Sequence, residues 1–223
     1  MRYVSLTVFL LCFVSSAGAE TISLWNFNDA ISGESGGLQE FLVDYGNGMM
    51  DSNFEEADIG NSSGSSVNTI FGDPAGLSLV LKDQANNGKN LTWMVDTTGF
   101  FNIGVRFATR RTSTGFNTNQ FFYSIDSGLS WLDYGSPYVP GIDFGLQSFD
   151  LGSIDALSNN SDAGFRIVFD GATSYSGNNR IDNLVVSGTP ASFIEPTPVP
   201  EPATAMLVGF GLLGILVIRR KTA

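Results

Sequence analysis

The sequence contains no histidine and a single cysteine, and these two shortages exclude several kinds of chemistry. Without histidine, the Ser-His-Asp and Cys-His nucleophile systems and histidine-containing zinc sites are missing in their usual forms. The single cysteine, Cys12, lies in the N-terminal apolar segment, so the region that follows has no disulfide and no thiol chemistry. That region must fold without covalent cross-links.

Basic residues are also scarce. Residues 20–198 carry seven Lys and Arg, which are the 11 of the whole chain less Arg2, Arg219, Arg220 and Lys221, and 21 of the 22 Asp and Glu, since Glu201 lies outside. The net charge of this region is therefore near -14. Because nucleic acid and anionic lipid require clustered cations, neither is expected as a partner. The charge suits divalent cations or neutral glycans, and solubility alone explains it equally well.

The first nineteen residues have the pattern of a secretory signal peptide. Arg2 precedes an apolar run from Val4 to Val14, and the small residues Ala17 and Ala19 give the A-x-A pattern that signal peptidase requires. We therefore expect cleavage after Ala19 and a mature chain that starts near Glu20. A retained N-terminal anchor is the alternative.

The C-terminal end has three parts. Val199-Pro200-Glu201-Pro202 is followed by an uncharged apolar run, Ala203 to Ile218, and then by the basic cluster Arg219-Arg220-Lys221. At about 1.5 Å per residue this run makes a helix of roughly 24 Å, which only just spans the ~30 Å hydrocarbon core. The sequence predicts a single transmembrane helix over residues 203–218 with its basic tail in the cytoplasm.

This three-part end resembles the PEP-CTERM sorting signal of exopolysaccharide-producing Gram-negative bacteria, over residues 199–223. The resemblance implies that an exosortase-type enzyme is a partner and reads a motif formed by Val199, Pro200, Glu201, Pro202, Arg219, Arg220 and Lys221. It also implies an exported protein that is anchored in the membrane before processing and then reaches the cell surface or the extracellular matrix. An ordinary C-terminal anchor that no processing enzyme reads is the alternative.

The region between the two ends reads as one all-β domain. Helical periodicity is nearly absent, and short β-branched and aromatic runs are separated by Gly, Asn, Asp and Ser. The sequence predicts an antiparallel β-sandwich of jelly-roll type over residues 20–188 and a Pro-rich spacer over residues 189–198. The expected strands are Thr21–Phe27, Val67–Phe71, Leu77–Lys82, Asn90–Asp96, Phe101–Thr109, Gln120–Ile125, Ser130–Tyr134, Gln147–Leu151, Phe165–Phe169 and Ile181–Ser187.

Three stretches between these strands have distinct expectations. Asp126-Ser127-Gly128 predicts a tight hairpin turn, because Gly128 can take a positive φ. Residues 33–66 are expected to form a long loop that is most mobile at residues 60–66, with some pairing open at Phe41-Leu42-Val43. A single helical turn is expected within Ile154–Asn160.

Three segments of the domain carry a second resemblance. Trp25-Asn26-Phe27-Asn28, the run Phe122 to Gly128 with Trp131, and the run Arg180 to Val186 resemble the jelly-roll ectodomains often carried by PEP-CTERM proteins. Those ectodomains are similar to carbohydrate-binding and lectin-like sandwiches. The resemblance implies the fold and leaves the ligand open.

Oxygen-bearing side chains at the two ends of the domain could hold Ca²⁺. Asn26, Asn28 and Asp29 on the first strand would meet Asp182 on the last strand if the two strands pair. Structural calcium sites in similar jelly rolls use such edge positions, and polar capping of strand ends is the alternative. The acidic loop Glu55-Glu56-Ala57-Asp58 lacks EF-hand spacing, and a solvated loop explains it better.

Aromatic residues in a Gly- and Pro-rich stretch are the candidate glycan-binding residues. Sugar rings stack on exposed aromatic faces, and carboxylates accept hydrogen bonds from their hydroxyls. Tyr134, Tyr138 and Phe144 could supply the rings and Asp143 the carboxylate. Tyr138 is expected to be exposed, whereas Trp131 is expected to lie in the core.

No residue pattern points to catalysis. Glycoside hydrolysis needs two positioned carboxylates, and no pair among the 21 acids is marked out. Arg110-Arg111 stands out in an acidic domain and could bind an anionic sugar, although charges that close a strand edge are the simpler reading. We predict a non-enzymatic structural or exopolysaccharide-binding protein. A secreted carboxylate- or calcium-dependent hydrolase that acts on polysaccharide is the alternative.

Overall fold

The computed structural model describes residues 18–29 and 39–191. Ala17, the predicted sorting motif, the predicted transmembrane helix and the basic tail lie outside the described residues. Within those two ranges, no helix is long and apolar enough to cross a membrane. The chain divides into two compact units, residues 1–191 and 192–223, and all described residues belong to the first.

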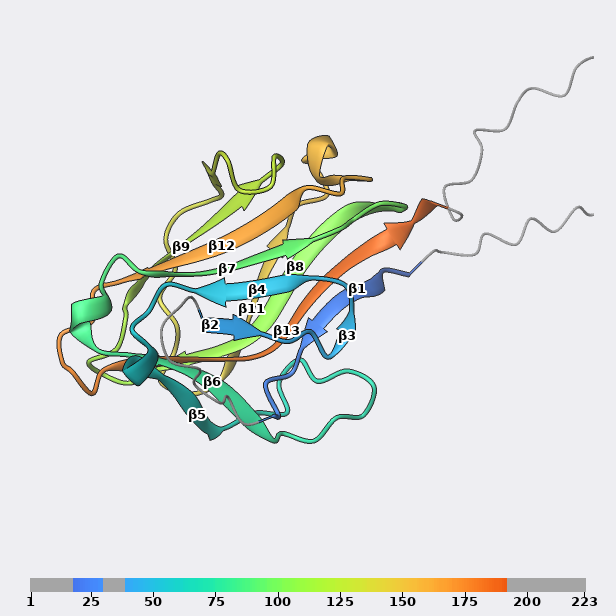
Figure 1. Ribbon diagram of the computed structural model, residues 1–223. Helices are drawn as coiled ribbons and strands as arrows, with labels where there is room; N and C mark the ends of the chain where they lie inside the picture. The colour runs from blue at the N-terminus through green and yellow to red at the C-terminus, as the bar shows by residue number, and fades with distance from the viewer. Residues whose placement is uncertain (1–17, 30–38, 192–223) are drawn as a thin grey trace, which may run out of the picture. The chain divides into compact units, whose positions relative to one another are not determined.

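The described residues form two antiparallel sheets that make a sandwich (Figure 1). The seven-stranded sheet has the order β11-β8-β13-β1-β3, with β6 on β13 and β5 on β6, and the six-stranded sheet has the order β10-β9-β12-β7-β4-β2. The antiparallel sandwich predicted from the sequence is confirmed. The elements are β1 Glu20–Trp25, β2 Gln39–Phe41, β3 Tyr45–Gly46, β4 Met49–Ser52, η1 Glu56–Asp58, β5 Ile59–Ser63, β6 Leu77–Lys82, η2 Gln84–Asn86, β7 Asn90–Val95, β8 Phe100–Arg111, β9 Thr118–Ser124, β10 Leu132–Asp133, β11 Gly145–Asp150, η3 Asp155–Leu157, β12 Ala163–Asp170 and β13 Asn178–Pro190.

One hydrophobic core lies between the sheets. In β12, Phe165, Ile167 and Phe169 are buried and the residues between them face outward, as period-two alternation requires. Phe121 of the six-stranded sheet stacks on Phe149 of the seven-stranded sheet, with ring centroids 3.9 Å apart. Aromatic packing across the interior therefore joins the two layers.

The predicted strand Val67–Phe71 is wrong. Asn68 and Phe71 have φ values of 62° and 57°, which lie outside the extended region of a regular strand. The amide of Asp73 donates to the carbonyl of Ile70 at 3.1 Å, and Gly72 also has a positive φ of 80°. Residues 70–73 therefore form a tight turn with two left-handed central residues.

The long loop predicted over residues 33–66 is wrong in part. β2 pairs Phe41 with Met50 of β4, which confirms the pairing left open at Phe41. The segment expected to be most mobile contains most of β5, whose backbone pairs with β6 from Ile59 to Ser63. Hydrogen bonds to a neighbouring strand thus order a stretch whose composition favours a loop.

The helical turn predicted within Ile154–Asn160 is confirmed by η3. The boundaries of the hairpin loop and of the Pro-rich spacer differ from the prediction. The Leu129 amide donates to the Asp126 carbonyl at 3.2 Å and closes a turn. The pairing of β9 with β10 begins only at Tyr123 and Leu132, so the loop is longer than a tight hairpin. β13 continues to Pro190, so residues 189 and 190 belong to the sandwich and not to the spacer. Proline is tolerated at the last position of a strand, where the ladder ends.

A bulge in β13 binds the loop formed by residues 64–76. The register with β8 shifts after Asp182, and Asn183 has a φ of 49°. The Nδ2 atom of Asn183 donates to the Ser65 carbonyl at 2.9 Å, and the Nδ2 atom of Asn68 donates to the Asn183 carbonyl at 2.7 Å. These contacts hold the loop on the outer face of the seven-stranded sheet.

Asp182, in the same bulge, is a fully buried carboxylate. Its Oδ2 atom accepts from the Ser65 amide at 2.6 Å and its Oδ1 atom from the Asn183 amide at 2.9 Å. Burial raises the pKa of Asp182 to about 7, although both hydrogen bonds oppose that shift. The folded protein therefore holds a proton on Asp182 more strongly than the unfolded chain does.

We predict that the metal-free protein loses stability as the pH rises from about 4 to about 8. Because the folded pKa of Asp182 is the higher one, its stabilising contribution is complete below the unfolded value and is lost as the pH rises through the folded value. The loss amounts to at most about 4 kcal/mol. Urea unfolding in chelator across this range measures it. Asp182→Asn should remove this pH-dependent loss of stability, and the control Asp143→Asn, at an exposed site, should keep it. If the free energy of unfolding of Asp182→Asn changes with pH as in wild type, the prediction is wrong.

Candidate functional site

The expectation that Tyr138 is exposed is wrong. Its ring is partly buried, with its centroid 6.4 Å from that of Phe107 and 5.8 Å from that of Phe149. Burial raises the pKa of the Tyr138 hydroxyl. Tyr134 packs in the same way, with its centroid 6.3 Å from that of Phe149. Both rings therefore extend the core between the sheets.

The other predicted glycan-binding residues lie in different surroundings. Asp143 is exposed, and the guanidinium of Arg110 lies 5.8 Å from the centroid of the Phe144 ring. Trp131 is only partly buried and not in the core, and the guanidinium of Arg166 lies 3.9 Å from its ring centroid. The structure thus divides the predicted set and does not gather it into one surface.

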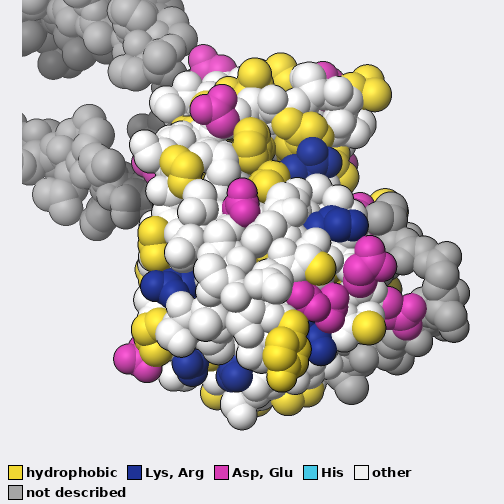
Figure 2. Space-filling view, turned by 90° about the vertical axis from the view of Figure 1, so that its left-hand side faces the viewer, with side chains coloured by type: hydrophobic (Ala, Val, Ile, Leu, Met, Phe, Trp, Pro, Cys, Tyr) yellow, Lys and Arg dark blue, Asp and Glu magenta, His cyan; other side chains and the backbone are white. Residues whose placement is uncertain are grey.

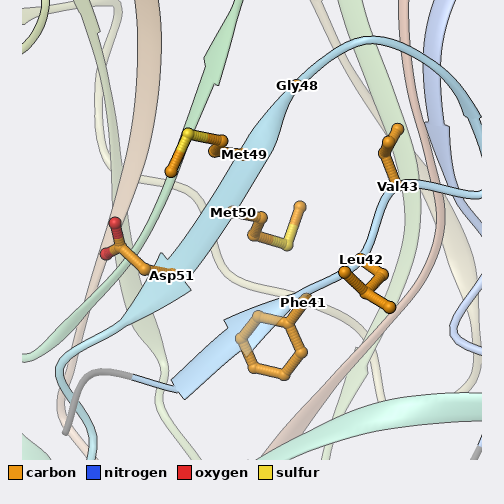
Figure 3. A pocket seen from close by; sticks show the side chains of 7 residues that line it. All are labelled: Phe41, Leu42, Val43, Gly48, Met49, Met50 and Asp51. Atoms are coloured by element: carbon orange, nitrogen blue, oxygen red, sulfur yellow. The ribbon is translucent and has the colours of Figure 1, made fainter.

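A pocket of about 250 Å³ lies between β2 and β4, at the end of the six-stranded sheet order. Figure 3 shows the side chains that line it, Phe41, Leu42, Val43, Met49, Met50 and Asp51, together with Gly48. The lining is apolar apart from one carboxylate and the backbone. A sugar needs several convergent hydrogen-bonding groups, so this pocket is a poor glycan site.

An exposed aromatic pair that the sequence analysis missed consists of Tyr45 in β3 and Phe71 in the turn of residues 70–73. Their side chains are 48% and 67% exposed, and their ring centroids lie 5.0 Å apart. A positive φ is strained for a bulky residue such as Phe71, and such strain marks candidate functional positions. Gly72-Asp73 is the turn signal from which the sequence could have shown this site.

Polar groups adjoin the aromatic pair. Asp44 and Asp73 lie one and two residues from its rings along the chain, and Asn26 connects them. The Asn26 amide donates to Asp44 Oδ2 at 2.7 Å, and its Nδ2 atom donates to Asp73 Oδ2 at 3.3 Å. Burial raises the pKa of Asp44, the Asn26 hydrogen bond opposes this, and the carboxylates of Asp29 and Asp73 raise it further. Aromatic rings beside carboxylate oxygens can stack on a sugar and bind its hydroxyls.

Of the four residues predicted to hold calcium, Asn26, Asn28 and Asp29 follow β1, and Asp182 lies in β13, which pairs with β1 up to Trp25 and Leu184. Asn26 and Asp29 belong to the polar group beside the aromatic pair, as the interactions with Asp44 show. The Asn28 amide donates to Asn26 Oδ1 at 3.0 Å, and the Asn28 Oδ1 atom accepts from the Leu77 amide at 2.8 Å, at the end of the loop bound by Asp182. In the ranges that the structure describes, no three His, Cys, Asp or Glu side chains are grouped to hold a metal.

Asp182 nevertheless has oxygen neighbours that suit a hard cation. A Cβ atom on Gly64 would lie 2.1 Å from the Ala75 carbonyl oxygen, 2.5 Å from that of Leu77 and 2.7 Å from Asp182 Oδ2. Three oxygens, one from a buried carboxylate, therefore lie close around Gly64, where the backbone leaves no room for a side chain. Ca²⁺ takes about six to eight oxygens at roughly 2.3–2.6 Å, so these residues fit part of a calcium shell.

Comparison with solved structures finds sandwich domains of low similarity, and no curated protein matches the chain. The CBM22-1 xylan-binding domain of Paenibacillus barcinonensis Xyn10C has a TM-score of 0.47 and 7% identity, covering 79% of this chain and 99% of that one. Domain 4 of AbnA, a GH43 extracellular arabinanase from Geobacillus stearothermophilus, in complex with arabinotriose, has a TM-score of 0.45 and 13% identity. The match covers 79% of this chain and 99% of that one. A CBM29-2 mutant complexed with mannohexaose has a TM-score of 0.41 and 16% identity, and the match covers 80% of this chain and 99% of that one. At TM-scores under 0.5, these similarities carry no inference about a ligand.

Comparison with protein families identifies the C-terminal segment. The family described as the PEP-CTERM protein-sorting motif matches residues 198–221. This range contains the Val-Pro-Glu-Pro sequence, the apolar run and the basic cluster from which the resemblance was inferred. The resemblance is confirmed, and the chain carries a PEP-CTERM sorting motif.

Proposed function

We propose that this protein is exported, processed by an exosortase-type enzyme and retained at the cell surface or in the extracellular matrix, where its jelly-roll sandwich binds polysaccharide. The sorting motif at residues 198–221 supports the export and processing steps. The exposed aromatic pair beside Asn26, Asp44 and Asp73 is the observation that carries the binding step.

The chemistry of this site favours a neutral sugar. The two rings are tilted by 55° and offer apolar surface to the C–H faces of a sugar. The neighbouring carboxylates accept hydrogen bonds from hydroxyl groups, and their negative charge disfavours a carboxylate-bearing sugar at the same place. Binding at this site should therefore depend on the rings and on hydroxyl contacts.

A polysaccharide hydrolase is the second candidate, because one feature of the site favours it. Glycoside hydrolysis pairs an acid of raised pKa with a second carboxylate. The raised pKa of Asp44 beside Asp73 meets that requirement in direction. New reducing ends that disappear in Asp44→Asn would identify a hydrolase.

A structural calcium ion is a further part of the proposal. We place it at Asp182, with the carbonyl oxygens of Ala75 and Leu77 as neighbouring ligands, because these oxygens converge beside Gly64. When bound, the ion would supply a positive charge that replaces the proton on the buried carboxylate. It would also fix the C-terminal end of the loop of residues 64–76, which carries Phe71.

We predict that Tyr45→Ala and Phe71→Ala each weaken polysaccharide binding about 5- to 30-fold, because each removes a stacking ring. Both side chains are exposed, so the melting temperature should change little. Affinity electrophoresis of the full-length protein in nonionic detergent, against neutral polysaccharides and the host exopolysaccharide, measures retention. The control Tyr175→Ala removes a ring that is 76% exposed and far from this pair in sequence. Wild-type migration that no polymer retards would refute binding, and a reducing-end assay on the same samples separates the hydrolase.

We predict that Ca²⁺ raises the melting temperature and that chelator reverses the rise. An ion that binds only the folded state stabilises it by about 2.7 kcal/mol at a hundredfold excess over Kd. Asp182→Asn should abolish the response because it removes the charged ligand, whereas Asp143→Asn should keep it. Identical wild-type melting curves in millimolar Ca²⁺ and in chelator would exclude the ion.

We predict that the mature surface protein lacks the segment from Arg219 to Ala223, because exosortase-type processing is expected near Pro200-Glu201-Pro202. Intact-mass measurement of protein extracted from the cell surface tests this expectation. Replacement of Glu201 and Pro202 by Ala should leave the C-terminal segment attached. Recovery of the complete C-terminus from wild-type cells would leave only an ordinary membrane anchor.

A further inference from the structure

Two arginines lie directly opposite each other on adjacent strands of the seven-stranded sheet. Arg110 of β8 pairs with Arg180 of β13 in antiparallel register. The next pair in the ladder, Thr109 and Ile181, is buried on the core side, so the two arginines are on the outer face. Like charges at directly opposite positions destabilise a sheet. The arrangement is therefore unfavourable unless an anion lies between them.

Neither guanidinium is neutralised within residues 18–29 and 39–191. The two ion pairs in these ranges involve only lysines, and no hydrogen bond joins the Arg110 or Arg180 side chain to a partner there. The Nε atom of Arg180 is buried without a partner, and so is that of Arg106, which lies on the same face of β8. Burial lowers the pKa of Arg180, and the charge of Arg110 lowers it further. A bound anion would relieve both effects.

The described side chains around the two arginines include one aromatic ring and no carboxylate that forms an ion pair with either guanidinium. Phe144, just before β11, lies against the Arg110 guanidinium with 5.8 Å to its ring centroid. Two carboxylates are close in sequence, Asp143 and Asp182. Asp182 is buried and accepts hydrogen bonds from backbone amides, and Asp143 forms no ion pair with any described residue. Around the pair, the face therefore presents two cations and one ring, and Arg106 lies four residues before Arg110 on the same face of β8.

We propose that Arg110, Arg180 and Phe144 bind a carboxylate-bearing sugar of an acidic polysaccharide. The planar guanidinium fork matches a carboxylate and can bind it with two parallel hydrogen bonds. The Phe144 ring provides apolar surface for the sugar that carries the acid. This inference rests on the proposed polysaccharide binding, and it adds an acidic polymer to the neutral sugars that the aromatic pair favours.

The negative charge of the whole chain does not prevent such binding. Charges on the surface are screened beyond about 8 Å at physiological ionic strength, so nearby groups dominate. Figure 2 shows acidic and basic side chains interspersed on the face in view, with no field of one sign across it. A local pair of arginines can therefore attract a carboxylate although the net charge is -11.

The test compares polygalacturonate with the same polymer after reduction of its carboxyl groups. In affinity electrophoresis of the full-length protein in nonionic detergent, wild type should bind the acidic polymer about tenfold more tightly than the reduced one. Arg110→Gln and Arg180→Gln should each abolish this preference, and Arg110→Lys should leave it intermediate because it keeps the charge and loses the fork. Molar NaCl should weaken the preference in wild type.

The matched control is Lys89→Gln, which removes one positive charge from a lysine paired with Glu55 at 3.6 Å. It should keep the preference, whereas an equal loss would show that net charge alone is responsible and overturn the proposal. A preference that survives in both arginine variants with native melting temperatures would overturn it too. If wild type binds neutral polymers but shows no preference for polygalacturonate, only this inference fails. If wild type binds no polymer, the proposed function fails with it.

Discussion

The side-chain amide of Asn183 holds the loop of residues 64–76 on the seven-stranded sheet, and two of the candidate sites depend on that contact. It donates to the carbonyls of Ser65 and Val67, which lie more than a hundred residues earlier in the chain. The same loop carries Phe71 and the oxygens near Asp182. Because a bulge in β13 points these groups at the loop, one local irregularity in a central strand positions both the aromatic ring and the candidate ion site.

The sandwich could be predicted because its signal is local. Alternation in segments such as β12 shows which residues are buried whatever the partner strand. The turn at Phe71 could not be predicted in this way, because the apolar run before Gly72 favours a strand when read alone. Hydrogen bonds between Asn68, Ser65 and a strand at the other end of the sequence override that preference. Sheet pairing likewise orders β5, whose Gly-Asn-Ser-Ser composition favours a loop.

The candidate sites show the same division between local and distant information. Residue type marked Asp182 and Asn26 as polar groups of interest, but only the structure shows that Asn26 bonds to Asp44 and that Asp182 bonds to the Ser65 amide. The Gly and Pro residues around Tyr138 predict an exposed ring, yet this ring packs against Phe107 and Phe149 of the core. The opposition of Arg110 and Arg180 likewise appears only once β8 and β13 are paired. Composition gives the net charge of a domain, but it does not show which charged side chains lie next to each other in the fold.

The length and position of β13 have a mechanical consequence. It is the longest strand among the described residues, with 13 residues, and it is hydrogen-bonded to β8 on one side and to β1 and β6 on the other. Tension applied to the chain beyond Ala191 would enter the domain through this strand. A load directed along the strand stretches many ladder bonds together in shear, so they resist as a group. The strand that leads to the sorting segment is therefore suited to bear a pulling force without unravelling the domain.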